Sequence, residues 1–243
     1  MLRFINAENL KCNRTFAKKL VLIAPLFMIL LAIFTGKYFV ENGFNWWYLI
    51  IFPGCISLTT ALINQNEENK LHYRAVFALP VSLRKVWISK VLLICVYVVA
   101  ASFIHLIGMI LGKLLYNPAS AITVPQMIAS TLILIIVSLW QIPLCLFLSQ
   151  KFGLMATILL NVGGGIVLAV FAASQSFWWV CPYSWSARLM CPVLGILPNG
   201  TFAPHGDPLL NAGVIPLGIV LSVSLFVLLL VLTANWFPRQ EVK

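Results

Sequence analysis

Three groups of residues in this chain have types and spacing that could carry chemistry, and the first looks like an ATP-binding loop. The run Gly108–Leu114 (GMILGKL) comes close to G-x-x-x-x-G-K-[ST], in which backbone amides and a lysine hold phosphates. It is one residue short, lacks the hydroxyl that holds magnesium, and ends a long apolar segment. The spacing of Gly108 and Gly112 favours close packing against another helix instead. We therefore predict that the chain does not hydrolyse ATP by itself.

The second group contains acids and histidines that could form a proteolytic site. Glu67 and Glu68 precede His72 and Arg74, which suggests the paired glutamates of an intramembrane protease, but the spacing from the glutamates to the arginine does not fit. His105 is the only histidine within a long apolar run. A hydrogen bond from His105 to a neighbouring helix is favoured over catalysis. The sequence therefore predicts that this chain is not an enzyme.

The third group is the cysteines. Cys181 and Cys191 share one segment, where a disulfide and two free thiols are both compatible with the sequence. No spacing of cysteine and histidine resembles a zinc site. We expect neither a metal nor a cofactor in this chain.

The charged residues also bear on how transport would be driven. Ion-coupled carriers place a carboxylate within the membrane, whereas none of the predicted spans contains Asp or Glu. The polar side chains of the spans include His105, Gln141 and Asn161, which suffice for hydrogen bonds between helices. The triplet Gly163–Gly165 suggests a bend or tight packing. Any active transport would draw its energy from a partner protein.

The elements that position these residues are apolar helices. The sequence is 61% hydrophobic and only 9% charged, against roughly 25% charged in a soluble domain. An apolar helix of about 20 residues crosses the hydrocarbon core of a bilayer. The sequence thus predicts an all-α integral membrane protein with six transmembrane helices and a single membrane domain over residues 1–243. The predicted spans are residues 20–35, 46–63, 91–111, 128–148, 152–173 and 213–234.

The basic residues predict the orientation. Thirteen of the 16 lysines and arginines lie in residues 1–19, in residues 64–90, at Lys151 or in the C-terminal tail. The other three are Lys37, Lys113 and Arg188. Basic loops remain in the cytoplasm, so both termini are predicted to be cytoplasmic. The cations flank spans rather than forming one basic face, so no nucleic-acid partner is expected.

Residues 1–19 are predicted to form an amphipathic helix on the membrane surface. At about 100° per residue, Arg3, Lys11, Arg14 and Lys18 fall on one stripe, with apolar residues near the opposite side. Lys11, Arg14 and Lys18 are the predicted contacts with membrane lipid. An ordinary basic flank before the first span is the alternative.

Local motifs resemble the membrane subunits of ABC-2-type exporters. They include the start of the chain from Glu8 to Leu20 and the loop 66–90, where acidic and basic residues precede Leu79-Pro80-Val81-Ser82 and a basic helix start. More specifically, the chain is similar to the lantibiotic-immunity permeases of the MutE/EpiE group. The resemblance implies that two permeases, identical or paired with a homologous sister, recruit two copies of a separate ATPase that binds ATP and magnesium.

The same resemblance implies the cargo and the host. Such a complex lies in the bacterial plasma membrane and expels a lantibiotic-like peptide from the membrane of a Gram-positive producer, which gives self-immunity. The alternatives are an ABC-2 permease for another cargo, such as a drug, a lipid or a polysaccharide precursor, and a membrane-embedded enzyme or sensor.

Within this resemblance, residues 64–90 are the predicted cytoplasmic coupling loop, which receives force from the ATPase. Leu71, Ala75 and Leu79 recur every four residues and give a short helix an apolar docking face, which Pro80 ends. Ser82 is placed to cap the next helix. A solvated basic loop is the alternative. The predicted coupling residues are Glu67, Glu68, Lys70, Arg74, Leu79 and Pro80.

The segment 174–212 is predicted to be extracytoplasmic, with a short part that re-enters the outer leaflet, as is common in ABC-2 permeases. It is rich in proline and in aromatic residues, whose rings settle at the membrane–water interface. Trp178, Trp179 and Trp185 are the predicted exit gate for an amphipathic peptide. An interfacial anchor is the alternative.

Overall fold

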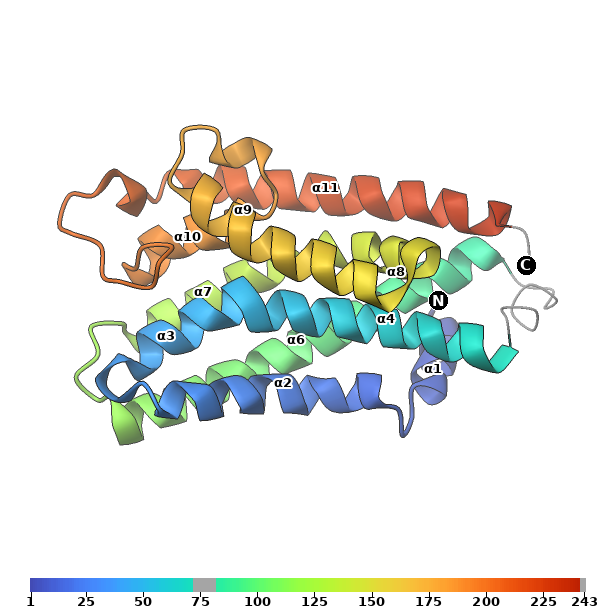
Figure 1. Cartoon of the computed structure of the whole chain (residues 1–243), viewed down its shortest axis with the longest axis horizontal. Coiled ribbons are helices and arrows are strands. Elements are labelled where there is room, and N and C mark those ends of the chain that lie inside the picture. Colours follow the sequence, from blue (N-terminus) through green and yellow to red (C-terminus); the bar gives the residue numbers. More distant parts are fainter. Residues whose placement is uncertain (72–81, 241–243) are drawn as a thin grey trace.

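The computed structural model describes residues 1–71 and 82–240, and for residues 66–71 it describes the backbone alone. Most of this part of the chain is helical, and it contains one isolated β-bridge, between Ile196 and Phe202 (Figure 1). The prediction of an all-α membrane protein is confirmed at this level. Where the sequence predicts six spans, the structure has five helical segments long and apolar enough to cross a membrane, and one shorter apolar helix. The five segments are Phe16–Ile33, Gly36–Gln65, Leu83–Tyr116, Gln141–Ala173 and Val214–Arg239, and the shorter helix is Val124–Ser138.

The N-terminal segment is two helices rather than the single predicted one. Helix α1 (Leu2–Lys11) ends at Cys12, and α2 (Phe16–Ile33) begins after Thr15. In the turn between them Arg14 adopts a φ of 63°, and the Thr15 hydroxyl donates a hydrogen bond of 2.7 Å to the Cys12 carbonyl. Such local bonds compete with a continuous helix. Arg14 therefore does not lie on the basic stripe that was predicted for one continuous helix.

The second apolar segment begins earlier than predicted. After a 3-10 turn at Gly36–Tyr38, helix α3 (Phe39–Trp46) passes through a π turn at Trp47–Ile51 into α4 (Phe52–Leu71). Pro53 lies two residues after the end of the π turn and has no N–H to bond the carbonyl four residues back, so the helical hydrogen-bond register changes there. The early start brings Glu41 into the candidate span Gly36–Gln65, so the expectation that no span contains a carboxylate is wrong.

Helix α6 (Leu83–Tyr116) is the longest element. Its 34 residues extend about 50 Å at 1.5 Å per residue, well beyond the hydrocarbon thickness of about 30 Å. It begins immediately after Ser82, as predicted, although the serine side chain makes no capping hydrogen bond. Because α4 continues to Leu71 and α6 starts at Leu83, both ends of the predicted loop 64–90 are helical.

The fourth predicted span is broken. Helix α7 (Val124–Ser138) starts with a capping box between Thr123 and Gln126. It stops before Trp140, and α8 (Gln141–Ile158) follows. Pro143 explains the break, since a residue without N–H fits the first turn of a new helix and not the middle of a continuous one.

The chain then reverses direction within α8, at Gly153. This glycine has φ 82° and ψ −179°, outside the helical region. Asn161 and Gln141 hydrogen-bond at 3.0 Å, whereas a continuous helix would separate them by about 30 Å. The returning leg passes through a π turn at Leu159–Gly163 into α9 (Gly164–Ala173).

The C-terminal third contains a short buried helix and a long exposed one. A 3-10 turn at Trp178–Val180 leads to α10 (Ser184–Leu194), which packs among α7, α9 and α11 and ends at Gly195 with a left-handed φ of 71°. A loop with a 3-10 turn at Pro208–Leu210 then leads to α11 (Val214–Trp236) and a final turn at Phe237–Arg239.

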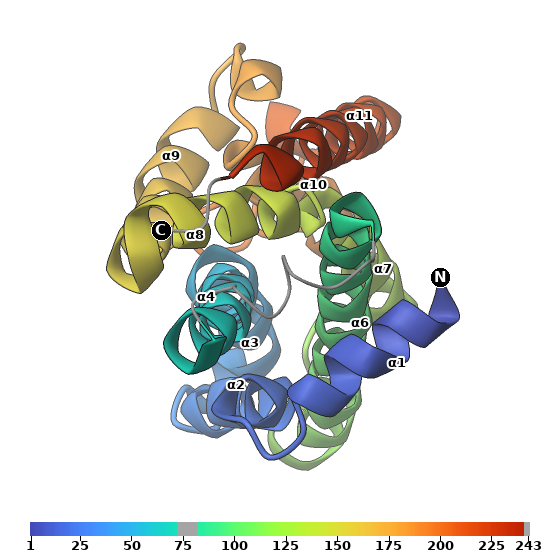
Figure 2. The same ribbon diagram turned by 90° about the vertical axis from the view of Figure 1, so that its right-hand side faces the viewer.

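The helices form one bundle with two distinct ends (Figures 1 and 2). At one end lie α1, the end of α4, the start of α6 and the end of α11; we call this the basic end. At the other, the α10 end, lie α10 and the connections that follow α2 and α6. Lys37, Lys113 and Arg188 belong to this second end. The charge asymmetry of the sequence therefore corresponds to a spatial asymmetry.

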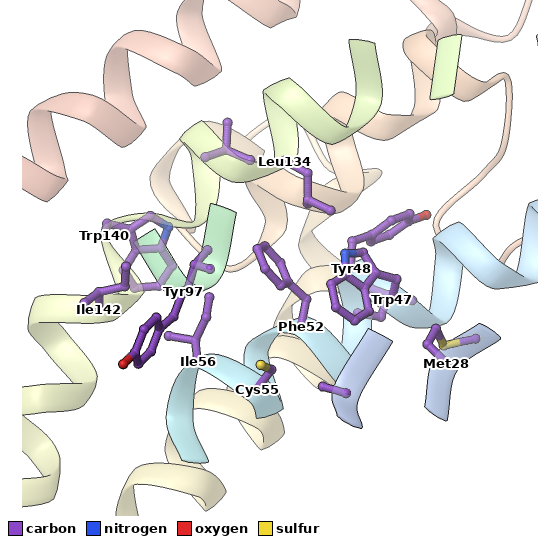
Figure 3. Close-up of a cluster of buried hydrophobic side chains, with 14 of the residues drawn as sticks. Met28, Trp47, Tyr48, Phe52, Cys55, Ile56, Tyr97, Leu134, Trp140 and Ile142 are labelled. Atoms are coloured by element: carbon purple, nitrogen blue, oxygen red, sulfur yellow. The ribbon is translucent and has the colours of Figure 1, made fainter. Parts of the chain in front are cut away.

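A buried core that includes several aromatic rings joins the helices (Figure 3). The Trp47 ring stacks on Phe52 at 5.1 Å between centroids, and Trp140 contacts Tyr183 edge-on at 5.1 Å. Lipid tails are as apolar as these side chains, so shape complementarity and hydrogen bonds, rather than release of water, hold such helices together. The packing of these helices therefore depends on where small and polar residues lie on their facing surfaces.

Candidate functional sites

Three of the six predicted coupling residues lie at the basic end, on the last turns of α4. Glu67, Glu68 and Lys70 belong to this helix. Arg74, Leu79 and Pro80 lie outside the described residues. The start of α6 at Leu83 lies at the same end of the bundle (Figure 1).

A buried amide ties the end of α4 to α8. Asn64, which is 1% exposed, lies one turn before Glu67 and donates hydrogen bonds to the Leu146 carbonyl (2.9 Å) and the Ser149 hydroxyl (2.6 Å). The sequence interpretation missed Asn64 because its partners are more than 80 positions away. A displacement of the end of α4 would therefore be transmitted to α8 through these hydrogen bonds.

The start of α6 is attached to the end of α11 in a similar way. The Trp87 indole donates to the Thr233 hydroxyl at 2.9 Å, and its ring lies 4.7 Å from that of Phe237. Lys90 is fully buried beside them, with its ammonium 5.4 Å from the Phe237 ring centroid. A cation over an aromatic face is stabilised by about 0.5–2 kcal/mol. Lys90 is therefore a packed residue as well as one of the predicted cytoplasmic cations.

The paired glycines of α6 lie against two neighbouring elements. A methyl group built on Gly112 would overlap the buried Phe39 ring, and one on Gly108 would overlap the end of Ile29. Gly43 faces Met109 in the same manner from α3. The run Gly108–Leu114 lies wholly within α6, so its amides are not free to cradle a phosphate. The Lys113 ammonium instead donates to the backbone carbonyls of the loop that follows.

Glu41 occupies a polar niche at the α10 end. The carboxylate accepts hydrogen bonds from the Ser120 hydroxyl at 2.7 Å and from the Asn117 amide at 3.4 Å, and it is 2% exposed. It lies in the first turn of α3, where the helix dipole favours a negative charge. This arrangement joins α3 to the connection between α6 and α7. The sequence interpretation missed it because it placed Glu41 before the span.

The polar side chains inside the bundle bond between helices, as predicted. The Asn161 amide nitrogen lies within hydrogen-bond distance of the Pro53 carbonyl (3.1 Å), the Ser57 hydroxyl (3.0 Å) and the Gln141 side chain (3.0 Å), so its two hydrogens are shared among three acceptors. His105 lies 3.2 Å from the Gly43 carbonyl and stacks on Trp47 at 4.3 Å. These bonds bring the two legs of α8 together with α4, and α6 together with α3.

The three predicted gate tryptophans divide into two buried rings and one exposed ring. Trp178 and Trp185 are 7% and 3% exposed, whereas Trp179 is 51% exposed. The Trp185 indole donates to the Trp179 carbonyl at 3.1 Å and its ring lies 6.2 Å from Trp140. Trp178 and Trp185 therefore have the contacts of an anchor, and only Trp179 could meet a cargo from outside without rearrangement.

Arg188 stabilises the same segment. It donates a hydrogen bond of 2.6 Å to the Leu209 carbonyl and lies 5.8 Å from the Trp178 ring centroid. Burial lowers the pKa of its guanidinium below the usual range, and the hydrogen bond and the ring compensate in part for the lost water.

Cys181 and Cys191 are free thiols, and burial raises the pKa of Cys191 to about 12.

The predicted membrane-surface cations gather at the basic end but not on one helix. Lys11 pairs with Glu8 at 2.7 Å on α1. Lys18, in the first turn of α2, donates to the Asn13 side chain at 2.7 Å, and Arg14 occupies the turn between the helices.

Together, these helices and sites define a multi-pass membrane protein whose polar groups mostly serve packing. A family model described as ABC-2 family transporter protein matches residues 15–196. The chain therefore belongs to the ABC-2 transporter family and is a membrane permease subunit, and this family implies an ABC ATPase as partner. No curated protein and no solved structure matches the chain.

Proposed function

We propose that this permease works in an ATP-driven exporter that removes a lantibiotic-like peptide from the membrane of a Gram-positive bacterium. Two copies of a separate ATPase bind ATP and magnesium, and the permease, which has no catalytic role of its own, pairs with a second copy or a homologous sister. The observation that carries the proposal is the placement of Glu67, Glu68 and Lys70 on the last turns of α4, at the same end of the bundle as the start of α6, in a chain of the ABC-2 family.

The proposed topology has six crossings. Helix α7 with the first leg of α8 makes the fourth, and the returning leg with α9 makes the fifth. The hydrogen bond between Asn161 and Gln141 supports this division, since it requires the chain to reverse. The basic end faces the cytoplasm, where cationic loops are retained. Helix α10 lies in the outer leaflet as a re-entrant element.

Coupling follows from the two attachments at the basic end. Force applied to residues 64–90 passes through Asn64 to α8 and through Trp87 to α11. Both α11 and the α7–α9 unit contact α10. A movement produced by the ATPase can in this way reach the α10 end through packed helices.

The exposed face of the outer segment, residues 174–212, favours an amphipathic peptide as cargo. Phe177, Trp179 and Val180 are 47%, 51% and 60% exposed, which forms a short apolar surface next to a structured turn. An amphipathic peptide that sits in the outer leaflet presents a matching apolar face. A drug, a lipid or a polysaccharide precursor would meet the same surface, and the resemblance to lantibiotic-immunity permeases favours the peptide.

The decisive experiment reverses the two glutamates of α4. In the Glu67→Lys, Glu68→Lys double variant we expect the permease to reach the membrane but to lose ATPase association or peptide-stimulated hydrolysis. The matched control is Gln65→Lys, which adds a cation to the same helix end and keeps both glutamates. Normal ATPase binding and stimulation in the double variant would refute the coupling role. Purification of the wild-type chain without any ATPase would favour a membrane enzyme or sensor.

A further inference from the structure

A groove at the basic end has the two-part chemistry of a phospholipid. It lies between α1, α2 and α6, encloses about 530 Å³, and is predominantly apolar. Its polar part contains Asn6, Asn9 and Lys18. Its apolar part includes Leu22 and Val96, which are 55% and 58% exposed and so open the groove toward lipid.

The apolar part runs along the direction of a lipid chain. Leu93, Val96 and Ala100 line it on successive turns of α6, over about 10 Å at 1.5 Å per residue. Helix α1 lies across the bundle at this end (Figure 2) and contributes Asn6 and Asn9 to the polar part. It is held there by a hydrogen bond of 2.7 Å from the Tyr97 hydroxyl to Asn9. The groove therefore passes from a polar rim to an apolar wall.

The charges around the rim are complementary to an anion. The Lys18 ammonium gives one hydrogen bond to Asn13 and has three donor hydrogens, so it retains donors for a phosphate oxygen. Arg14 is exposed nearby in the sequence. The carboxylate of Glu8 is paired with Lys11, which offsets its negative charge locally. The amide nitrogen of Asn9 adds a neutral donor.

We propose that this groove is a binding site for one anionic phospholipid, with its phosphate at Lys18 and an acyl chain against Val96 and Ala100. The site would fasten α1 to the seam between α2 and α6. This assignment does not depend on the identity of the exported cargo, since it rests on the groove and its charges alone.

The test titrates the purified, delipidated full-length chain with palmitoyl-oleoyl phosphatidylglycerol or phosphatidylcholine and counts bound lipid by native mass spectrometry. We expect tighter binding of phosphatidylglycerol. Lys18→Gln should weaken it about fivefold, which corresponds to about 1 kcal/mol for one cation near an anionic headgroup. The matched control, Lys19→Gln, removes the same charge from the next position, outside the groove lining, and should change binding less than twofold.

A second variant tests the apolar part. Ala100→Phe fills the groove while every cation remains, and it should abolish the bound phosphatidylglycerol. The control Ile107→Phe adds bulk at an exposed position of α6 outside the groove lining and should not.

Equal effects of Lys18→Gln and Lys19→Gln would overturn the proposal in favour of general attraction to a basic surface. Displacement of the lipid by millimolar inorganic phosphate would assign the site to a free anion. If Lys18→Gln released the ATPase and left lipid binding unchanged, the groove would belong to a protein partner, and the lipid assignment would be wrong.

Discussion

Gly112→Ala offers the sharpest check on the packing of α6. The added methyl group would overlap the Phe39 ring, which is fully buried and lies 5.8 Å from Tyr116 between ring centroids. The ring is rigid and enclosed, so it has little room to move. Overpacking of this kind costs about 1–3 kcal/mol.

The intrinsic helix preference of alanine acts in the opposite direction, by up to about 1 kcal/mol. Gly163→Ala isolates this second effect, because no atom lies within 4 Å of the new methyl group and the backbone is helical at φ −62° and ψ −45°. The difference between the two variants therefore measures the overpacking alone. Gly108→Ala should fall between them, since the end of Ile29 can rotate away.

The assay is thermal unfolding of the purified protein in detergent, followed by tryptophan fluorescence. For a chain of this size 1 kcal/mol corresponds to about 2–4 °C, so the midpoint of Gly112→Ala should lie about 2–12 °C below that of Gly163→Ala. Phe39→Leu shortens the ring side chain and should recover part of the loss in the double variant. Equal midpoints for the two glycine variants, with no recovery by Phe39→Leu, would show that Gly112 does not hold this contact.

Three further predictions test the orientation, the outer segment and the polar centre. In a background without native cysteines, a cysteine at Lys37 should react with an impermeant thiol reagent from outside intact cells and one at Lys85 should not; reaction at Lys85 would invert the topology. Trp179→Ala should lower peptide resistance while the complex stays assembled, whereas Trp185→Ala should unfold at a lower temperature, because truncating a buried tryptophan costs about 3–5 kcal/mol. Identical behaviour of the two variants in both assays would contradict the division between gate and anchor. Asn161→Leu should lower stability in detergent by about 1 kcal/mol, since it removes an amide whose two hydrogens serve three acceptors on neighbouring segments, at about 0.6 kcal/mol for each hydrogen bond. An unchanged midpoint would show that these bonds contribute nothing.

The class of the protein and the positions of its apolar helices could be predicted because they depend on local composition. An apolar run of about 20 residues is long enough to cross the hydrocarbon core, and a helix there forms its backbone hydrogen bonds within itself. The basic residues are likewise a property of the sequence, and they mark the two ends that the fold separates. His105 could be interpreted from its surroundings alone, since a lone histidine in an apolar run needs a hydrogen-bond partner.

Helix boundaries were predicted less well, for local reasons that composition does not reveal. The helix that carries Glu41 starts before the apolar run because a carboxylate is stable in a first helical turn. The predicted span 128–148 breaks near Pro143, and the helix predicted over residues 1–19 breaks at the turn that contains Arg14.

Only the tertiary structure decided which side chains of a given type are buried. Trp178 and Trp179 are adjacent and chemically identical, yet Arg188 covers the first while the second remains exposed. In the sequence Lys90 resembles the other cations of residues 64–90, but in the structure the turn after α11 brings the Phe237 ring next to its ammonium. The physical reason is the same in both cases: composition determines that a helix enters the membrane, whereas burial and hydrogen bonding depend on which distant helix lies opposite each residue.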